Sequence, residues 1–115
     1  MEQPEREPSS LIPLTPAVFH ILLALAHGDC HGYAIMAEVN TLTQGQIHLG
    51  PGTLYRSIQK MVLDGLIDEI EHAHGADDDE RRRYYKLTAF GKRVARAEAN
   101  RLSILVKAAT QRGVL

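Results

Sequence analysis

Three side chains that carry hydrogen-bond donors recur at helical spacing in the middle of this 115-residue chain. Arg56 and Lys60 are four residues apart and Gln59 lies between them, so a helix would bring all three to one face. Arginine can pair with guanine and glutamine with adenine, and Thr53 and Tyr55 can donate to phosphates. Spacing alone favours a simpler interpretation, an amphipathic helix with a solvated polar face.

A second group of candidate side chains could bind a metal ion. His27, Cys30 and His31 lie within five residues and carry the imidazole and thiol ligands that zinc prefers. No fourth ligand is evident, and the neighbouring glycines indicate a turn between helices. The acidic run at 77–80 lacks the ligand spacing of a calcium loop. We therefore expect no metal and no cofactor.

Several classes of protein are excluded or made less likely by the absence of their motifs. The chain has no phosphate-binding glycine loop, no nucleophile elbow and no paired-histidine metal motif, so we expect no enzymatic activity. One cysteine cannot form an internal disulfide, which favours a reducing compartment. The apolar stretch 21–26 is far too short to span a bilayer, and residues 1–10 do not form a signal peptide. We expect a cytoplasmic protein without a membrane partner.

The net charge of −1 conceals two opposed blocks of sequence. Residues 1–80 contain three basic and thirteen acidic side chains, whereas residues 81–115 contain ten basic side chains and one acidic one. Such asymmetry indicates a charged partner such as nucleic acid. A solvated hairpin with internal ion pairs explains it equally well.

Capping residues and apolar spacing predict three helices in the first half of the chain. After a mobile tail at 1–11, Thr15 and Pro16 begin a largely buried helix at 15–27. A short helix is expected at 32–39, followed by a loop at 40–50. A third helix at 52–64 has one apolar stripe and ends at a glycine.

The second half of the chain predicts a hairpin and a long helix. Residues 66–73 and 84–87 favour strands joined by a charged tip. Thr88 caps a helix at 89–112 whose apolar seam, interrupted by Arg101, includes Phe90, Val94, Leu102, Leu105 and Val106. The fold expected is mainly α with a small β-hairpin: a winged helix-turn-helix domain at 12–87 and a C-terminal dimerisation helix at 88–115.

This arrangement suits the reading of double-stranded DNA. The major groove is about 12 Å wide and admits one helix, here the helix at 52–64. Arg81, Arg82 and Arg83 at the hairpin tip can follow the phosphate backbone or enter the adjacent minor groove. A long helix with an apolar seam needs a partner, which predicts a homodimer with its recognition helices about 34 Å apart. The alternative is that this helix folds back on the first one, and we expect both contacts.

Several short motifs, taken together and in this order, resemble the PadR family of bacterial transcriptional regulators. They are Leu-Thr-Pro at 14–16, His-Gly-Tyr-Ala-Ile at 31–35, Pro-Gly-Thr-Leu-Tyr at 51–55, Gly-Leu-Ile at 65–67, Arg-Tyr-Tyr-Lys-Leu-Thr at 83–88, and Gly91. The resemblance covers residues 12–112. It implies a winged helix-turn-helix protein, usually a repressor, that dimerises through C-terminal helices and binds inverted-repeat operators.

The resemblance also implies roles for single residues. Tyr33 matches a tyrosine near the DNA backbone, and Thr53 and Tyr55 match the DNA face of the recognition helix while Leu54 packs inward. Two departures matter: many relatives have proline where this chain has Arg56, and the acidic run at the wing should repel phosphate. The single C-terminal helix indicates a short member of the family.

The resemblance further implies a small-molecule effector bound near the dimer interface. The chain contains no tryptophan, so an aromatic ligand cannot stack between tryptophans as it does in some relatives. A function of another class also fits a winged helix, namely a protein-interaction module that does not bind DNA. The two hypotheses differ in whether duplex binding occurs at low salt and weakens steeply as salt is added.

Overall fold

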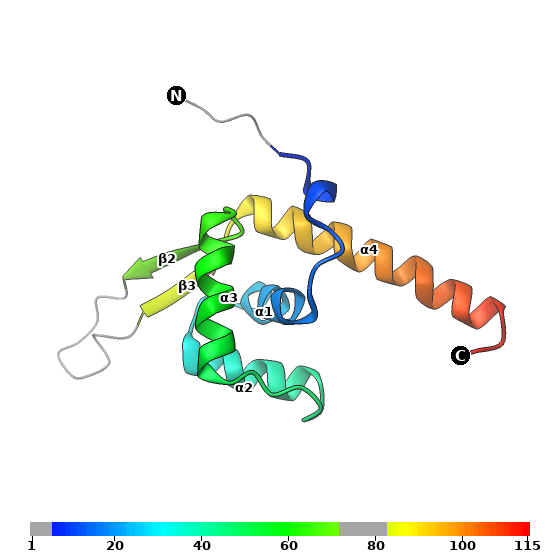
Figure 1. The fold of residues 1–115 in the computed structure, drawn as a ribbon, viewed down its shortest axis with the longest axis horizontal. Helices are drawn as coiled ribbons and strands as arrows, with labels where there is room; N and C mark the ends of the chain where they lie inside the picture. Colours follow the sequence, from blue (N-terminus) through cyan, green and yellow to red (C-terminus); the bar gives the residue numbers. More distant parts are fainter. Residues whose placement is uncertain (1–5, 72–82) are drawn as a thin grey trace.

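A computed structural model describes residues 6–71 and 83–115 and places a small sheet against a group of helices (Figure 1). The elements follow the order η1 (Pro8–Leu11), α1 (Pro16–Ala26), β1 (Cys30–His31), α2 (Gly32–Leu42), α3 (Pro51–Leu63), β2 (Ile67–Glu71), β3 (Arg83–Leu87) and α4 (Ala89–Gln111). Over these residues, no helix is both long enough and apolar enough to cross a membrane. The fold is mainly helical with a winged helix-turn-helix arrangement, as the sequence predicted.

The helix starts are set by side-chain caps that the sequence predicted. The Thr15 hydroxyl accepts a hydrogen bond from the Val18 amide at 3.3 Å, and the Thr88 hydroxyl accepts one from the Gly91 amide at 2.9 Å. Helix α2 continues to Leu42, three residues beyond the predicted end, so the following loop begins later than expected.

The sheet has one more strand than the sequence predicted. Strands β2 and β3 form the expected antiparallel hairpin, with Ile67 opposite Leu87. Strand β1 adds to the other edge of β3, pairing Cys30 with Tyr85 and His31 with Tyr84. A two-residue strand is too short to show an alternating pattern, so this segment was interpreted as a turn.

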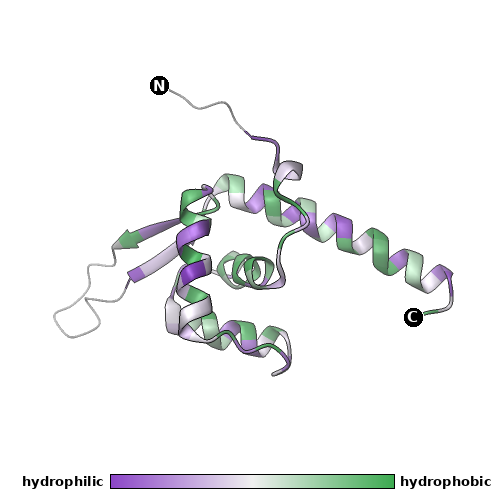
Figure 2. Ribbon diagram, viewed as in Figure 1, coloured by the Kyte–Doolittle hydropathy of each residue, from purple (hydrophilic) through white to green (hydrophobic). Residues whose placement is uncertain are grey.

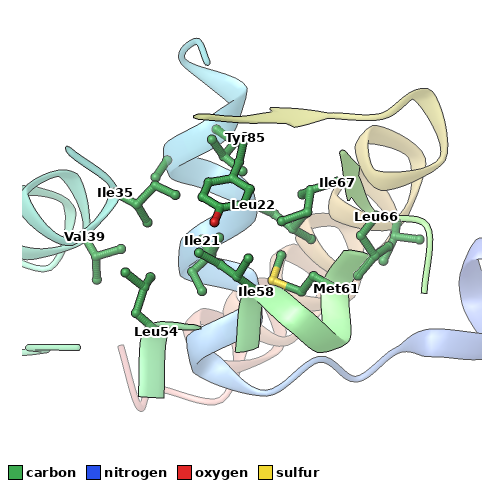
Figure 3. Close-up of a cluster of buried hydrophobic side chains, with 13 residues drawn as sticks. Ile21, Leu22, Ile35, Val39, Leu54, Ile58, Met61, Leu66, Ile67 and Tyr85 are labelled. Atoms are coloured by element: carbon green, nitrogen blue, oxygen red, sulfur yellow. The ribbon is translucent and has the colours of Figure 1, made fainter. Parts of the chain in front are cut away.

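One hydrophobic cluster joins all of these elements (Figure 3). Ile21 and Leu22 of α1 are fully buried at its centre, which confirms that α1 is largely internal. Helix α3 packs on this cluster through the predicted apolar stripe, and Tyr85 enters it from β3. The fully or nearly fully buried residues are Ile21, Leu22, Ala24, Leu25, Ile35, Val39, Leu54, Ile58, Met61, Leu66, Ile67, Tyr85 and Val94.

The N-terminal segment is more structured than the expected mobile tail at 1–11. Residues Pro8–Leu11 form the 3₁₀ helix η1, which packs against α4. Leu11 and Ile12 are partly buried against the core, and their apolar contacts hold the segment on the surface of the domain. Residues 1–5 lie outside the described residues.

Helix α4 has two halves with different surroundings. Its first half packs against α1, so the expected contact with the first helix is confirmed. Val94 is fully buried, which corrects its assignment to the dimerisation face: it belongs to the core of its own chain. Phe90 packs against the core but is only partly buried, so its assignment to the dimerisation face stays a prediction. Further along, Leu105 and Val106 are 53% and 54% exposed, because α4 extends past the core (Figure 1).

Candidate nucleic-acid interface

Helix α3 is held on the domain by one face, which leaves the opposite face in solvent. Leu54, Ile58 and Met61 recur at helical spacing and are 0%, 3% and 0% exposed. The helix begins with Pro51 after an extended Gly50, and no side chain caps its first turn. The backbone amides at this end are therefore available to an anion such as a phosphate.

The opposite face of α3 brings together four of the predicted DNA-binding residues. Thr53, Arg56, Gln59 and Lys60 are all exposed there. The Lys60 ammonium lies 3.0 Å from the Asp64 carboxylate one turn later, an exposed pair that stabilises the helix only slightly. Arg56 has no ion-pair partner among residues 6–71 and 83–115, so its guanidinium is free to bind an external acceptor.

The sequence analysis missed an apolar side chain on this face. Leu63 is 82% exposed and lies one turn after Gln59 on α3. Continuing the spacing of Arg56 and Gln59 by one more turn would have identified it, but only polar residues were sought. An exposed apolar group on a helix in the major groove can contact the methyl group of thymine.

Tyr55 has a packing role that its predicted position on the DNA face did not indicate. Its hydroxyl lies directly over Gly32 at the start of α2, in the space that a side chain at that position would occupy. The residue is still 41% exposed, so Tyr55 connects α3 to α2 and borders the outward face rather than standing at its centre.

Tyr33, the other predicted aromatic contact, directly follows Gly32 at the start of α2. It is 67% exposed in the first turn of α2. Its ring meets the His31 imidazole at a centroid distance of 6.5 Å, and His31 meets Tyr84 of β3 edge-on at 5.3 Å. Tyr33 therefore belongs to a group of three aromatic rings, with His31 and Tyr84, that joins the start of α2 to the sheet.

The three side chains considered as zinc ligands have other contacts. His31 Nδ1 accepts a hydrogen bond from the Ala34 amide at 3.2 Å and so caps α2. Burial, together with nearby carboxylates, raises the pKa of the Cys30 thiol, which favours the protonated form over the thiolate that metals bind. His27 lies 3.8 Å from the Glu38 carboxylate. Among the described residues, no three potential ligands are grouped around a common point.

The described part of the wing places one of its three predicted arginines beside α3. Arg83 Nε lies 3.3 Å from a carboxylate oxygen of Glu69 on the neighbouring strand. Arg81, Arg82 and the acidic run at 77–80 lie outside the described residues. A groove of about 430 Å³ separates α3 from the wing and is lined by Tyr55, Ile58, Gln59, Val62, Leu63, Glu69, Arg83 and Tyr85.

Comparison with known proteins identifies one family. The model of the transcriptional regulator PadR-like family matches residues 21–97. A protein of 37.1 kDa in transposon TN4556 of Streptomyces fradiae, itself uncharacterized, is 32% identical over 85 residues. Those residues make up 74% of this chain but only 22% of that protein, so the chain spans a small part of its length.

Solved structures show the same fold. A PadR family transcription regulator from hypervirulent Clostridium difficile is 25% identical, with a TM-score of 0.72 over 84% of this chain and 97% of that one. Bacillus subtilis PadR in complex with operator DNA is 21% identical, with a TM-score of 0.60 over 70% of this chain and 45% of that one. The similarity to Bacillus subtilis PadR shows a shared fold and nothing further.

Proposed function

Because the chain belongs to the PadR-like family of transcriptional regulators, we propose that it binds a specific double-stranded DNA sequence through α3 and the wing. Its family consists of regulators and not of enzymes. The observation that carries the proposal is the outward face of α3, where Arg56 and Gln59 are exposed on a helix fixed to the core by its opposite face. A rigid helix of this kind can present base-reading side chains with little loss of conformational freedom.

Each exposed side chain on this face has a chemically suitable partner on DNA. Arg56 would pair with the O6 and N7 atoms of guanine, and Gln59 with the N6 and N7 atoms of adenine. Thr53 and Lys60 would contact phosphates beside the groove. Tyr33 and the wing arginines Arg81, Arg82 and Arg83 would contact the sugar-phosphate backbone on either side.

We further propose that the protein acts as a homodimer. The second half of α4 exposes Ile104, Leu105 and Val106, which are 68%, 53% and 54% exposed. Figure 2 shows hydrophobic stretches on this projecting part of the helix. Leu102, just before these three residues, is half-buried. Apolar side chains gathered on a projecting helix are typical of a protein interface, and a second copy of α4 would cover them. A twofold dimer would bind an inverted-repeat operator.

We propose that the regulatory outcome is repression, relieved by a small-molecule effector near the dimer interface. The support is the resemblance of the chain to a family whose members are mostly repressors. A reporter gene placed behind the selected operator tests the direction of the effect. Expression should fall when the protein is produced, and a rise would contradict the repressor assignment.

The DNA-binding proposal is tested by selecting genomic fragments bound to the purified protein and sequencing them. The native chain should enrich fragments that share an inverted repeat. Arg56→Ala should bind with altered preference at one position of each half-site, at a cost of about 1–3 kcal/mol for the lost base contact. Arg96→Ala removes another exposed cation, from α4, and should leave the selected sequence unchanged.

Two results would contradict the proposal. The first is the absence of duplex binding even at low salt, which would favour a protein-interaction module instead. The second is an identical set of selected sequences for Arg56→Ala and the native chain, which would exclude Arg56 from base reading.

A further inference from the structure

Helix α4 approaches the end of α3 backbone to backbone at Gly91. A side chain at this position would place its Cβ 2.0 Å from the carbonyl oxygen of Leu66, far closer than two such atoms can lie. Leu66 is the third residue after the end of α3, and it is 2% exposed. Glycine is therefore required at position 91 by the close contact between the first turn of α4 and the turn after α3.

Hydrogen bonds reinforce this contact. The Thr88 amide donates to the Leu66 carbonyl at 3.1 Å, and the Thr88 hydroxyl is shared between the carbonyls of Gly65 and Leu66 at 2.7 and 3.0 Å. The same hydroxyl oxygen accepts a hydrogen bond from the Gly91 amide. Gly65 itself adopts a left-handed conformation with φ of 78°, and the Leu66 amide returns to the Met61 carbonyl at 2.9 Å, so the turn is well defined.

The N-terminal segment adds a third connection between the same two helices. The Arg6 guanidinium donates to the carbonyl of Asp64, the residue directly after α3. The central carbon atom of the Arg6 guanidinium also lies 5.5 Å from the centre of the Phe90 ring on α4. We name Gly65, Leu66, Thr88 and Gly91, together with Arg6, the α3–α4 joint.

The α3–α4 joint connects the proposed DNA-reading helix to the proposed dimerisation helix. Helix α4 has 23 residues and is about 34 Å long, so a rotation of about 5° at the joint would move its far end by about 3 Å. In a dimer formed through α4, such a rotation would change the distance between the two α3 helices. That distance determines which operator spacing both helices can engage together.

We propose that Gly91 and Thr88 are positioning residues that fix the angle between α3 and α4 and thereby set the operator half-site spacing. The inference rests on the proposed function, because spacing matters only if a dimer binds DNA. Neither residue is among the proposed DNA contacts. Their effect is on the geometry of the two reading helices and not on which bases each one recognises.

The test compares Gly91→Ala with the native chain on duplexes whose half-sites are moved apart or together one base pair at a time. Alanine favours helix over glycine, so any loss must come from the forced separation of α4 from Leu66. The preferred spacing should shift, and affinity for the original spacing should fall about tenfold or more as simultaneous engagement is lost. Binding to a duplex with a single half-site should change less than about twofold.

A milder pair of variants covers the case in which Gly91→Ala does not fold. Thr88→Val keeps the shape of the side chain but removes its hydroxyl, whereas Thr88→Ser keeps the hydroxyl. Thr88→Val should broaden or shift the spacing preference, and Thr88→Ser should restore the native one. Thermal unfolding and sedimentation confirm that each variant used is folded and dimeric.

A distance measurement separates failure of this inference from failure of the proposed function. In a Cys30→Ser background, spin labels at Leu63→Cys and Lys107→Cys report the α3–α4 geometry without DNA, in labelled chains diluted with unlabelled ones. Gly91→Ala or Thr88→Val should change this distance by a few ångströms. Unchanged distances together with an unchanged spacing preference overturn the inference. If no duplex is bound at all, the proposed function fails and the label distance alone decides whether the joint fixes the angle.

Discussion

The Glu98 carboxylate is the acceptor for three hydrogen bonds in the interior of the domain. The residue is 2% exposed, and its two oxygens accept from Arg101 Nε and Nη2 at 2.7 and 2.8 Å and from the Leu14 amide at 3.2 Å. These hydrogen bonds to Glu98 explain why Arg101 interrupts the apolar seam of the sequence. Leu14 directly precedes Thr15, the cap of α1. The hydrogen bond from the Leu14 amide to Glu98 therefore connects α4 to the start of α1.

Replacing this carboxylate should lower stability in a pH-dependent way. The hydrogen bonds from Arg101 lower the pKa of Glu98 below its usual value, so the ionised form stabilises the native state above the unfolded pKa of about 4.3. Glu98→Gln should lower the free energy of unfolding by about 1–3 kcal/mol at pH 7. The difference from the native chain should shrink as the pH falls through the pKa of the folded state. Denaturant unfolding between pH 3 and pH 7 measures it.

The control for this effect is a carboxylate closer to the surface. Glu38→Gln changes a carboxylate whose side chain is 34% exposed and whose neighbour, His27, is itself 82% exposed. It should alter stability by less than about 0.5 kcal/mol. A pH-independent loss in Glu98→Gln would show that the ionised form is not the source of the stabilisation.

At the scale of elements, α4 combines two roles along its length. Its first half completes the core of its own chain through Val94 and Phe90, and its second half projects with apolar side chains exposed (Figure 2). The sequence shows one continuous seam, because helical spacing does not reveal where the rest of the domain ends. The structure divides that seam near Leu102: Val94 before it is buried in the core, whereas Leu105 and Val106 beyond it are exposed.

This division predicts how single substitutions affect the proposed dimer. Leu105→Glu places a charge among the exposed apolar residues and should convert the dimer to a folded monomer, because burying an unpaired carboxylate is costly. Sedimentation velocity measures the oligomeric state, and circular dichroism checks the fold. Ser103→Glu adds the same charge to an exposed polar position and should leave the dimer intact. A dimer that persists in Leu105→Glu would place the interface elsewhere.

At the scale of the whole molecule, the net charge of −1 is spread unevenly. On the proposed reading surface, Lys60 is paired with Asp64 and Arg83 with Glu69. Both pairs are exposed, so exchanging a carboxylate for a phosphate costs little. The molecule is therefore expected to bind DNA weakly in general, with its affinity coming from a few cations that a dimer doubles.

The salt dependence of binding tests this account. Each neutralised phosphate contributes about −0.9 to the slope of log K against log salt concentration. Lys60 and Arg83, the proposed phosphate contacts among the described residues, would give a slope of about −4 when two protomers bind, and the inclusion of Arg81 and Arg82 would give about −7. Anisotropy titrations between 50 and 300 mM salt, roughly the range in which such slopes are measured, distinguish the two values. A slope near zero would contradict a phosphate-binding surface.

The sequence by itself determined the order of α1, α2, α3, the hairpin and α4, and the residues that could read DNA. Caps such as Thr15 and Thr88 and the apolar stripe of α3 act over one or two helical turns, so local spacing is enough to identify them. The same spacing placed Arg56, Gln59 and Lys60 on one face, as the structure shows. The family resemblance followed from motifs of three to six residues.

Only the tertiary structure decided which side chains the rest of the domain covers. It placed Val94 in the core, added β1 to the sheet, set the Tyr55 hydroxyl over Gly32 and brought Gly91 against Leu66. Each of these contacts joins segments that are distant in the sequence, and their distance depends on how all the elements pack together. Local spacing therefore cannot reveal them, because burial is a property of the assembled domain and not of any one helix.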